Sequence, residues 1–348
     1  MPEKMRAVVK TEPGPGAALL TVEIPQIGPK DVLVRVKATS ICGTDVHIYE
    51  WNEWAQGRIH PPQIMGHEFA GEVVEVGSQV KSLKVGDFVS AETHIPCGQC
   101  IQCKTGQQHI CANLKILGVD TNGCFADYVA LPEVVAWKND EDIPSELASV
   151  QEPLGNAVYA TLVTGVTGKK VAVFGDGPTG LFSVGVARVS GAAEIFAVGR
   201  HPFRLEIAKK MGADIVLNEH EVDVVDAILT ATEGIGVDIA LDMAGSQDSI
   251  DQTLKVVRKG GRVTAFGIPS GPVQIDLANG VVFKGITIHG ISGRLMFDTW
   301  FKAANLLKSG RLDISPVITH KLPLDEFEKG FALMTTRPKM SGKVVLLP

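Results

Sequence analysis

The sequence predicts an α/β protein of two domains, one rich in β-strands and one built on a doubly wound parallel sheet. The chain has 348 residues, more than a single ordinary hydrophobic core accommodates. Short valine-rich runs separated by glycine and proline fill the first 150 residues. From Gly168 onward, apolar strands alternate with helical stretches, which is the pattern of a parallel sheet covered by helices on both faces.

The first part of the chain is expected to be all-β. Its strand-like runs are Met5–Val9, Val32–Ala38, Gly71–Val76 and Phe88–Glu92. In the second part, the predicted strands are Lys170–Phe174, Glu194–Val198, Ile215–Leu217, Ile239–Met243 and Arg262–Phe266. The predicted helices between them are Thr179–Val189, Arg204–Met211, Val222–Thr232 and Ile250–Val257.

The tail adds a helix at Asp298–Lys308 and a closing strand at Gly342–Leu346. We assign this tail to the first domain, so that the parallel-sheet domain is an insertion. The predicted domains are then residues 1–155 with 298–348, and residues 156–297.

The composition indicates which binding partners are excluded and in which cell compartment the protein is expected. The net charge is −6, from 33 basic and 39 acidic residues without a basic run, which argues against nucleic acid. No apolar stretch reaches membrane-spanning length, and the first residues lack the apolar region of a signal peptide. We therefore expect a cytoplasmic protein, in which clustered cysteines bind metal instead of forming disulfides.

Four cysteines lie within fifteen residues, with the spacing C-x2-C-x2-C-x7-C. Cys97, Cys100, Cys103 and Cys111 suit a tetrahedral all-thiolate site, most simply structural zinc. An iron–sulfur cluster is the competing metal, although the spacing differs from that of ferredoxins. Free thiols in a loop are the remaining alternative. A closed site of four cysteines has no open position, so the chemistry must lie elsewhere.

A glycine-rich turn follows the predicted strand Lys170–Phe174. Gly175, Gly177 and Gly180 form G-x-G-x-x-G between a strand and a helix, which in this context predicts a dinucleotide site. The helix N-terminus presents free N–H groups to a pyrophosphate. A glycine turn without a nucleotide is the structural alternative.

The second strand of the parallel sheet departs from the dinucleotide pattern. An acidic residue that binds the adenosine ribose is expected at its end, but the chain has Gly199-Arg200 there, followed by Arg204. Nearby arginines favour the 2′-phosphate of NADP. Arg200 in solvent, or stacked on adenine, is equally compatible with NAD, so both cofactors stay open.

A second set of potential metal ligands lies in the β-rich part. Cys42, His67, Glu68 and, at the domain junction, Glu152 offer one thiolate, one imidazole and carboxylates. Such a set binds zinc and leaves a position for a substrate oxygen. Taken singly, Cys42 and His67 could be core residues and Glu68 a surface charge.

These motifs occur in the order found in zinc-dependent medium-chain alcohol dehydrogenases, which the chain resembles over essentially its full length. The family resemblance rests on Gly66–Glu68, Cys97–Cys111 and Gly175–Gly180. Further segments resemble the members of that family that oxidise L-threonine. They are Cys42–Trp51, Glu92–His94, Gly118–Thr121, Gln151–Asn156 and Gly293–Arg294.

The resemblance implies a fold and roles for individual residues. It implies a GroES-like catalytic domain and a Rossmann domain, two zinc ions per subunit, NAD or NADP, and a homotetramer. Cys42, His67 and Glu68 would hold the catalytic zinc, with Glu152 as an interchangeable or neighbouring partner, and Thr44 and His47 would relay the alcohol proton. The dinucleotide contacts that it adds are Thr179, Arg204, Phe266, Gly267, Ile268, Ile291 and Ser292.

The implied reaction is oxidation of the 3-hydroxyl of L-threonine to 2-amino-3-oxobutanoate. Arg294 would meet the substrate carboxylate, with a surface salt bridge as its alternative role, and Glu152 or His94 would meet the ammonium group. Polyol or 2,3-butanediol oxidation by the same zinc chemistry is the first alternative. A non-catalytic nucleotide- or zinc-binding protein is the second. The apolar run Ile286–Ile291 is expected at a subunit contact, and Cys124 is expected to be buried.

Overall fold

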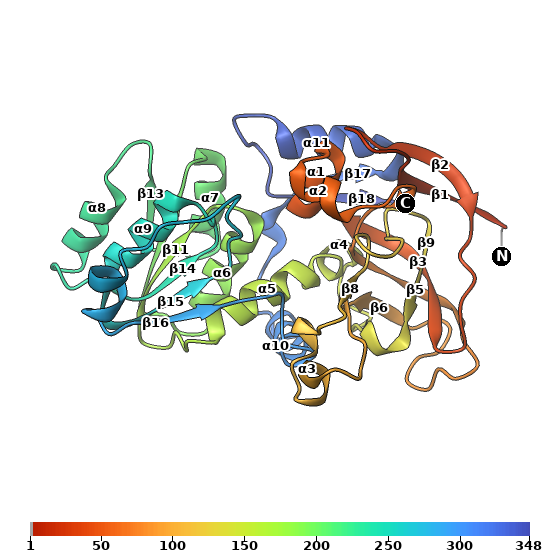
Figure 1. Cartoon of the computed structure of the whole chain (residues 1–348), viewed down its shortest axis with the longest axis horizontal. Helices are drawn as coiled ribbons and strands as arrows, with labels where there is room; N and C mark the ends of the chain where they lie inside the picture. The colour runs from red at the N-terminus through yellow and green to blue at the C-terminus, as the bar shows by residue number, and fades with distance from the viewer. Residues whose placement is uncertain (1–2) are drawn as a thin grey trace.

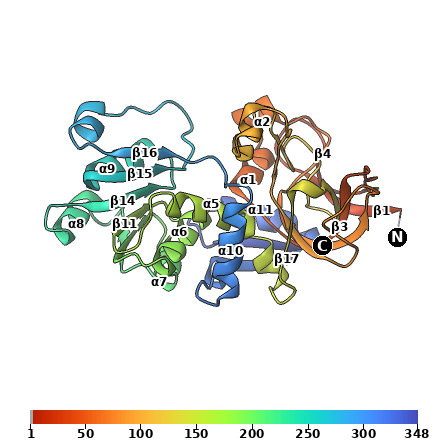
Figure 2. The same cartoon turned by 90° about the horizontal axis from the view of Figure 1, so that it is seen from below.

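The computed structural model describes residues 3–348, which form two lobes lying side by side (Figure 1). One lobe contains the parallel sheet, and the other contains the N-terminal strands together with the last strands of the chain. Helices α5 (Gln151–Leu162) and α10 (Asp298–Lys308) pack against each other between the two lobes (Figure 2).

The parallel sheet has the strand order of a dinucleotide-binding fold. Its order is β13-β12-β11-β14-β15-β16, with every pair parallel. This is the 3-2-1-4-5-6 order of a doubly wound sheet. The strands are β11 (Lys170–Phe174), β12 (Glu194–Gly199), β13 (Ile215–Asn218), β14 (Val237–Asp242), β15 (Val257–Ala265) and β16 (Thr287–Gly290).

Helices cover both faces of this sheet. Residues of α5, α6 and α7 share one apolar core with the strands, and residues of α8 and α9 share another. Strands buried on both faces explain the nearly continuous apolar runs in this part of the sequence. The helices are α6 (Pro178–Val189), α7 (Pro202–Lys210), α8 (Val224–Ala231), α9 (Gln247–Val256) and a π-helical turn, Leu277–Val282.

The other lobe is built from mainly antiparallel strands. Its largest sheet has the order β10-β6-β5-β3-β18-β17, with β9 paired to β3. A smaller sheet has the order β2-β1-β4, and β7 pairs with β8. The strands are β1 (Lys4–Lys10), β2 (Ala18–Glu23), β3 (Asp31–Ser40), β4 (Gln63–Ile64), β5 (Glu68–Val76), β6 (Phe88–Ala91), β7 (His94–Ile95), β8 (Lys115–Ile116), β9 (Tyr128–Pro132), β10 (Ala136–Lys138), β17 (Ile318–Pro323) and β18 (Lys343–Leu347).

The expectation that the first 150 residues are all-β is wrong. Short helices interrupt the strands, namely α1 (Gly43–Glu50), α2 (Glu53–Arg58), α3 (Ile101–Lys104) and α4 (Ser145–Ala148). Helix α1 is stabilised by packing, since Tyr49 stacks on Phe331 of α11 (Phe327–Thr335) at 4.2 Å. Single-turn 3₁₀ helices occur at Gln108–Ile110, Glu133–Val135, Ser315–Val317 and Leu324–Glu326.

The C-terminal strand returns to the N-terminal sheet. Strand β18 pairs antiparallel with β3, with Val345 opposite Ser40 and Leu346 opposite Thr39. This pairing brings Lys343 beside the first residue of β5, Glu68. The domain boundaries at 155/156 and 297/298 stay a prediction. No helix among the described residues 3–348 is both long and apolar enough to cross a membrane.

Candidate active site

The cysteines at 97, 100, 103 and 111 come together around α3. Their sulfur atoms all lie within 4.8 Å of one another, and Cys100 Sγ is 3.5 Å from Cys103 Sγ and 3.7 Å from Cys111 Sγ. Four sulfurs about 2.3 Å from one zinc ion in a tetrahedron would be about 3.8 Å apart, which these distances match. An iron–sulfur cluster holds several atoms between its thiolates and needs a wider spacing. The arrangement therefore fits one ion.

Hydrogen bonds from the surrounding backbone also suit thiolates. The N–H groups of Cys97 and Asn113 each lie 3.3 Å from Cys111 Sγ. Hydrogen bonds from the backbone of Gln99 and Cys100 lower the pKa of Cys97 to about 6, whereas burial raises the pKa of Cys103 to about 12. A bound cation favours deprotonation of all four thiols, because thiolates are the ligand form.

A second ligand group lies where β3 and β5 pair. Ligand atoms of Cys42, His67 and Glu68 lie within 4.8 Å of one another, and the last two residues are buried. Ser40 and Glu68 are opposite each other in the antiparallel register, so the residues that follow β3 and precede β5 must meet. One sulfur, one nitrogen and one oxygen are a donor set that zinc accepts with a position left open.

Asp45 orients two members of this group, and sequence reasoning missed that role. Its carboxylate accepts a hydrogen bond from the backbone N–H of Cys42 at 2.9 Å and lies 3.5 Å from Nδ1 of His67. Burial alone would lower the pKa of His67, but Asp45 and Cys42 raise it well above the ordinary value. A metal would compete with that proton, and an aspartate beside a ligating imidazole fixes its orientation.

The carboxylate of Glu68 is buried and already paired. Lys343 of β18 donates to Glu68 Oε1 at 2.6 Å and also contacts Oε2, and Ser40 donates to Oε2. Burial alone would lower the pKa of Lys343, but Glu68 raises it above the ordinary value. The surface role considered for Glu68 is therefore wrong. Lys343 and any ion at Cys42 and His67 would share this carboxylate.

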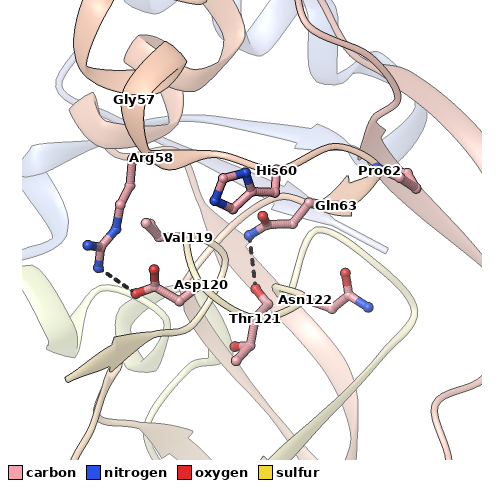
Figure 3. A pocket seen from close by; sticks show the side chains of 9 residues that line it. All are labelled: Gly57, Arg58, His60, Pro62, Gln63, Val119, Asp120, Thr121 and Asn122. Atoms are coloured by element: carbon pink, nitrogen blue, oxygen red, sulfur yellow. Dashed lines mark hydrogen bonds and ion pairs between the residues drawn. The ribbon is translucent and has the colours of Figure 1, made fainter. Parts of the chain in front are cut away.

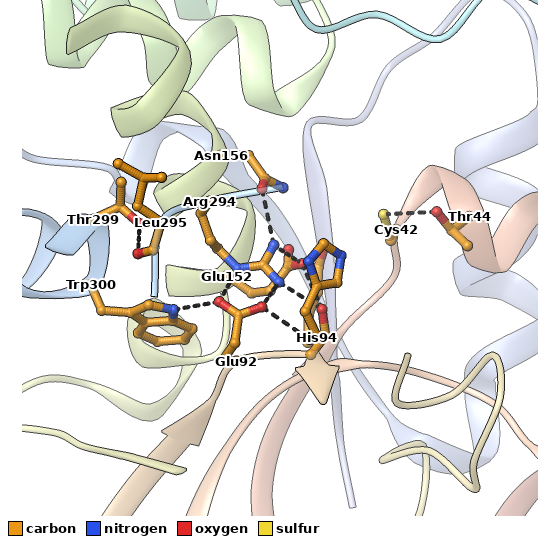
Figure 4. A network of polar contacts seen from close by, with 12 residues as sticks. Cys42, Thr44, Glu92, His94, Glu152, Asn156, Arg294, Leu295, Thr299 and Trp300 are labelled. Carbon is orange, nitrogen blue, oxygen red and sulfur yellow. Dashed lines mark hydrogen bonds and ion pairs between the residues drawn. The ribbon is translucent and has the colours of Figure 1, made fainter. Parts of the chain in front are cut away.

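Figure 4 shows a network of buried charges centred on Arg294. Its Nε donates to Glu92 Oε2 at 2.7 Å, and one Nη donates to Glu152 and, at 2.9 Å, to Asn156. The other Nη donates to Glu92 and, at 2.7 Å, to Thr93. All five N–H groups of the guanidinium are used.

This network corrects both expectations for Arg294. The side chain has no exposed surface, so it forms no surface salt bridge. With every donor engaged, it has none left for a substrate carboxylate. Instead it joins the segment after β16 to Glu92, which follows β6, and to Glu152, in the first turn of α5.

Glu152 lies outside the group formed by Cys42, His67 and Glu68. Its Oε1 is held by Arg294 and lies 3.2 Å from Thr93 Oγ1. Its Oε2 is buried without a hydrogen-bond partner among the described residues. A buried unpaired carboxylate oxygen is costly, so this atom is suited to a bound cation or ammonium group.

His94 lies next to the same network (Figure 4). Burial and the nearby Arg294 lower the pKa of His94 to about 4, so the imidazole is neutral near pH 7. Its Nδ1 is buried without a hydrogen-bond partner in residues 3–348. A neutral ring of this kind can offer a donor or an acceptor to a substrate.

The two predicted relay residues lie on α1, but no hydrogen bond joins them within residues 3–348. Thr44 Oγ1 is 3.8 Å from Cys42 Sγ, which places the hydroxyl beside the ligand group. His47 is exposed, and its Nδ1 lies 3.0 Å from Asn52 Nδ2. Within residues 3–348 no hydrogen bond joins Thr44 to His47, so a bound molecule or water would have to complete the relay.

The predicted dinucleotide residues gather at one edge of the parallel sheet. The turn Gly175–Gly180 leaves β11, Phe266–Ile268 follows β15, and Ile291-Ser292 follows β16. Gly175 has a φ of +113°, which favours glycine, and Gly177 is the N-cap of α6 without a capping side chain. The first N–H groups of α6 are therefore free at the carboxyl end of β11, where doubly wound folds bind a pyrophosphate.

The residues at the end of β12 and just after it are in contact with other parts of the chain. Gly199 is buried, and Arg200 forms an ion pair with Glu219. Arg204 is buried in α7 and donates from Nε to the carbonyl of Ser341 at 2.7 Å. Arg200 is therefore paired with a carboxylate, and Nη1 of Arg204 lies 3.9 Å from the carboxylate of Asp176.

A separate cavity of about 430 Å³ opens in the β-rich lobe beside α2 (Figure 3). It contains the ion pair of Arg58 with Asp120, at 2.7 Å. No member of either ligand group lines it. The lining residues are Gly57, Arg58, His60, Pro62, Gln63, Val119, Asp120, Thr121 and Asn122.

Two family models match the chain, one in each lobe. The alcohol dehydrogenase GroES-like domain matches residues 28–141, and the zinc-binding dehydrogenase model matches residues 178–309. These matches and the fold place the chain in the class of two-domain alcohol dehydrogenases. Within that class, the chain belongs to the zinc-binding dehydrogenase family, as the resemblance implied.

The chain is also similar over its whole length to individual proteins. It is 54% identical to the L-threonine 3-dehydrogenase of Caldanaerobacter subterraneus subsp. tengcongensis, over 99% of both chains. The L-threonine 3-dehydrogenase of Pyrococcus horikoshii is 51% identical, over 100% of this chain and 99% of the other. A zinc-binding dehydrogenase from Sinorhizobium meliloti, solved with bound NADP, superposes with a TM-score of 0.92 at 29% identity, with 100% of both chains covered.

Proposed function

We propose that this protein oxidises the 3-hydroxyl of L-threonine to 2-amino-3-oxobutanoate, transferring hydride to NAD or NADP. The observation that supports this most is the convergence of Cys42 with the buried His67 and Glu68 in a chain about half identical to L-threonine 3-dehydrogenases. The reaction removes one hydride and one proton, so the site must bind the alcohol, accept the hydride and conduct the proton away.

Two zinc ions per chain fit the two ligand groups. The cysteines at 97, 100, 103 and 111 would hold a structural ion with no open position. Cys42, His67 and Glu68 would hold a catalytic ion, with Glu152 as a nearby partner. Zinc, when bound there, supplies a Lewis acid that lowers the pKa of an alcohol. NAD, when bound at Gly175–Gly180, supplies the hydride acceptor.

The chain's own residues would handle the proton and the amino acid. Thr44 would accept the alcohol proton through its hydroxyl and pass it toward His47, which faces solvent. Glu152 Oε2 and the neutral ring of His94 are the groups suited to the substrate ammonium. Arg294 would act on the substrate only by holding Glu152 in place.

Replacing Thr44 with valine tests the relay. We expect kcat to fall about 100-fold, because general acid–base groups contribute about that much, with KM little changed. Thr44→Ser keeps the hydroxyl and should retain most of the activity. Zinc content per chain should equal that of the wild type in both variants. A valine variant with the wild-type kcat would contradict the relay.

Initial rates decide between L-threonine and the alternative substrates. Zinc-loaded enzyme should turn over L-threonine with a higher kcat/KM than sorbitol or 2,3-butanediol, and chelation should abolish the activity. Faster turnover of the polyol or diol would favour the related dehydrogenase. Absence of turnover with all three would favour a non-catalytic role.

A homotetramer is also proposed, on the basis of an exposed sheet edge. Strand β16 is the last strand of the parallel sheet, and Ile288 on it is 41% exposed. Phe283, just before this strand, is 72% exposed. Unpaired edges with apolar side chains favour pairing with a second copy. A cytoplasmic location remains part of the proposal, because the four-cysteine site requires reduced thiols.

A further inference from the structure

The carboxylate that is missing at the end of β12 is replaced by one from the glycine-rich turn. A Cβ atom placed on Gly199 would lie 2.5 Å from Oδ2 of Asp176. The side chain of Asp176 therefore fills the space that a side chain at position 199 would occupy. This is possible because β11 and β12 are adjacent and parallel, with Phe174 opposite Val198.

The contacts of Asp176 fix its carboxylate at this place. Oδ2 accepts hydrogen bonds from the backbone N–H groups of Arg200, at 2.9 Å, and His201, at 2.8 Å. Nδ1 of His201 lies 3.0 Å from both oxygens, and Nη1 of Arg204 lies 3.9 Å from Oδ1. Oδ2 is engaged by both amides, whereas Oδ1 keeps capacity for a further donor.

These contacts bear directly on the choice of dinucleotide. In doubly wound folds, a carboxylate at the end of the second strand accepts hydrogen bonds from the adenosine ribose, whereas a 2′-phosphate needs free donors and cations. Here the two backbone donors after β12 are taken by Asp176. The guanidinium of Arg200 is paired with Glu219 and lies 3.9 Å from Asp248.

We infer that Asp176 binds the adenosine ribose hydroxyls through Oδ1 and rejects the 2′-phosphate, so that the enzyme selects NAD over NADP. The inference rests on the proposed function only in that the glycine-rich turn binds a nicotinamide dinucleotide. The rival role for Asp176 is purely structural, as a cap on the N-terminus of α7, whose own N-cap residue His201 makes no side-chain cap.

Fluorescence titration of the zinc-loaded enzyme with NADH and NADPH tests this without any substrate. The wild type should bind NADH at least about 100-fold more tightly, because a carboxylate beside a phosphate is strongly unfavourable. Asp176→Ala should free the two amides and reduce that ratio by about 10- to 100-fold. Asp176→Asn removes the charge but keeps an acceptor, so it should reduce the ratio less.

Asp223→Ala is the matched control, because Asp223 caps α8 through Asp226 N–H at 3.0 Å in the same sheet domain. It should lower the unfolding midpoint without changing the NADH/NADPH ratio. The inference is overturned if the wild type binds NADPH as tightly as NADH, or if Asp176→Ala changes stability but not the ratio. Binding of neither nucleotide would overturn the proposed function as well. Selective NADH binding that weakens in Asp176→Ala, without turnover of L-threonine, would support Asp176 and contradict only the substrate.

Discussion

Replacing Cys42 with serine is expected to lower kcat/KM for L-threonine by at least about three orders of magnitude, since a metal supplies several kcal/mol of charge stabilisation. In the ligand group of Cys42, His67 and Glu68, the one sulfur atom belongs to Cys42. A serine hydroxyl binds zinc far more weakly than a thiolate, because the hydroxyl stays protonated near pH 7. The alcohol would then keep its ordinary pKa, and the hydride would have to leave a neutral carbinol.

Metal content separates this effect from misfolding. Elemental analysis should show two zinc ions per wild-type chain and one per Cys42→Ser chain, with the same thermal midpoint. Cys124→Ser is the matched control, because Cys124 is buried beside Thr39 Oγ1 at 3.2 Å and lies outside both ligand groups. It should keep both ions and most of the activity. The reciprocal variant Cys100→Ser should lose the other ion and unfold at a lower temperature. Wild-type turnover by Cys42→Ser would refute the catalytic zinc.

The parts of the fold with a strong local pattern could be predicted from the sequence. The helix expected at Asp298–Lys308 is found with those bounds, and the strand at Lys170–Phe174 likewise. The four cysteines converge because they are close in sequence, and a span of fifteen residues cannot separate them far. Cys42 and His67 are farther apart, but Cys42 lies two residues after β3 and His67 directly before β5, and the pairing of these strands brings them together.

The electrostatic partners of the site could not be predicted, because they depend on the register of distant strands. Glu68 and Lys343 are 275 residues apart, and Glu92 and Arg294 are 202 residues apart. No periodic pattern marks such a pair before the fold is known. Asp176 was overlooked for a different reason. It lies in the glycine-rich turn after β11, and only the pairing of β11 with β12 places its carboxylate against Gly199.

Replacing Arg294 with alanine is expected to lower the free energy of unfolding by about 3–5 kcal/mol, the cost of leaving buried charge unpaired. Burial alone would raise the pKa of Glu92, but Arg294 holds it below the ordinary value. Trp300 of α10 donates to the same carboxylate at 2.9 Å, so the substitution would also weaken the attachment of α10. Equilibrium urea denaturation of the zinc-loaded protein measures the change.

The pH dependence identifies the charge as the cause. A carboxyl with a lowered pKa stabilises the wild-type fold above its unfolded pKa, and that stability is lost as the pH falls through the folded value. In Arg294→Ala the unpaired Glu92 would instead be easier to protonate. The variant should therefore lose most free energy of unfolding, relative to the wild type, at neutral and higher pH. The difference between the two proteins should therefore shrink on acidification toward about pH 4, near the ordinary carboxyl pKa.

An exposed pair provides the control for Arg294. Arg35 lies 3.4 Å from Glu72 with half of its side chain exposed, so Arg35→Ala should cost less than about 1 kcal/mol. Arg294→Lys keeps the charge but has three donors in place of five, and its cost should fall between the two alanine variants. If Arg294→Ala costs no more than Arg35→Ala, or if its cost is independent of pH, then Glu92 and Glu152 do not depend on Arg294. The unpaired Oε2 of Glu152 would then have to be held in place by Thr93 and the first turn of α5 alone.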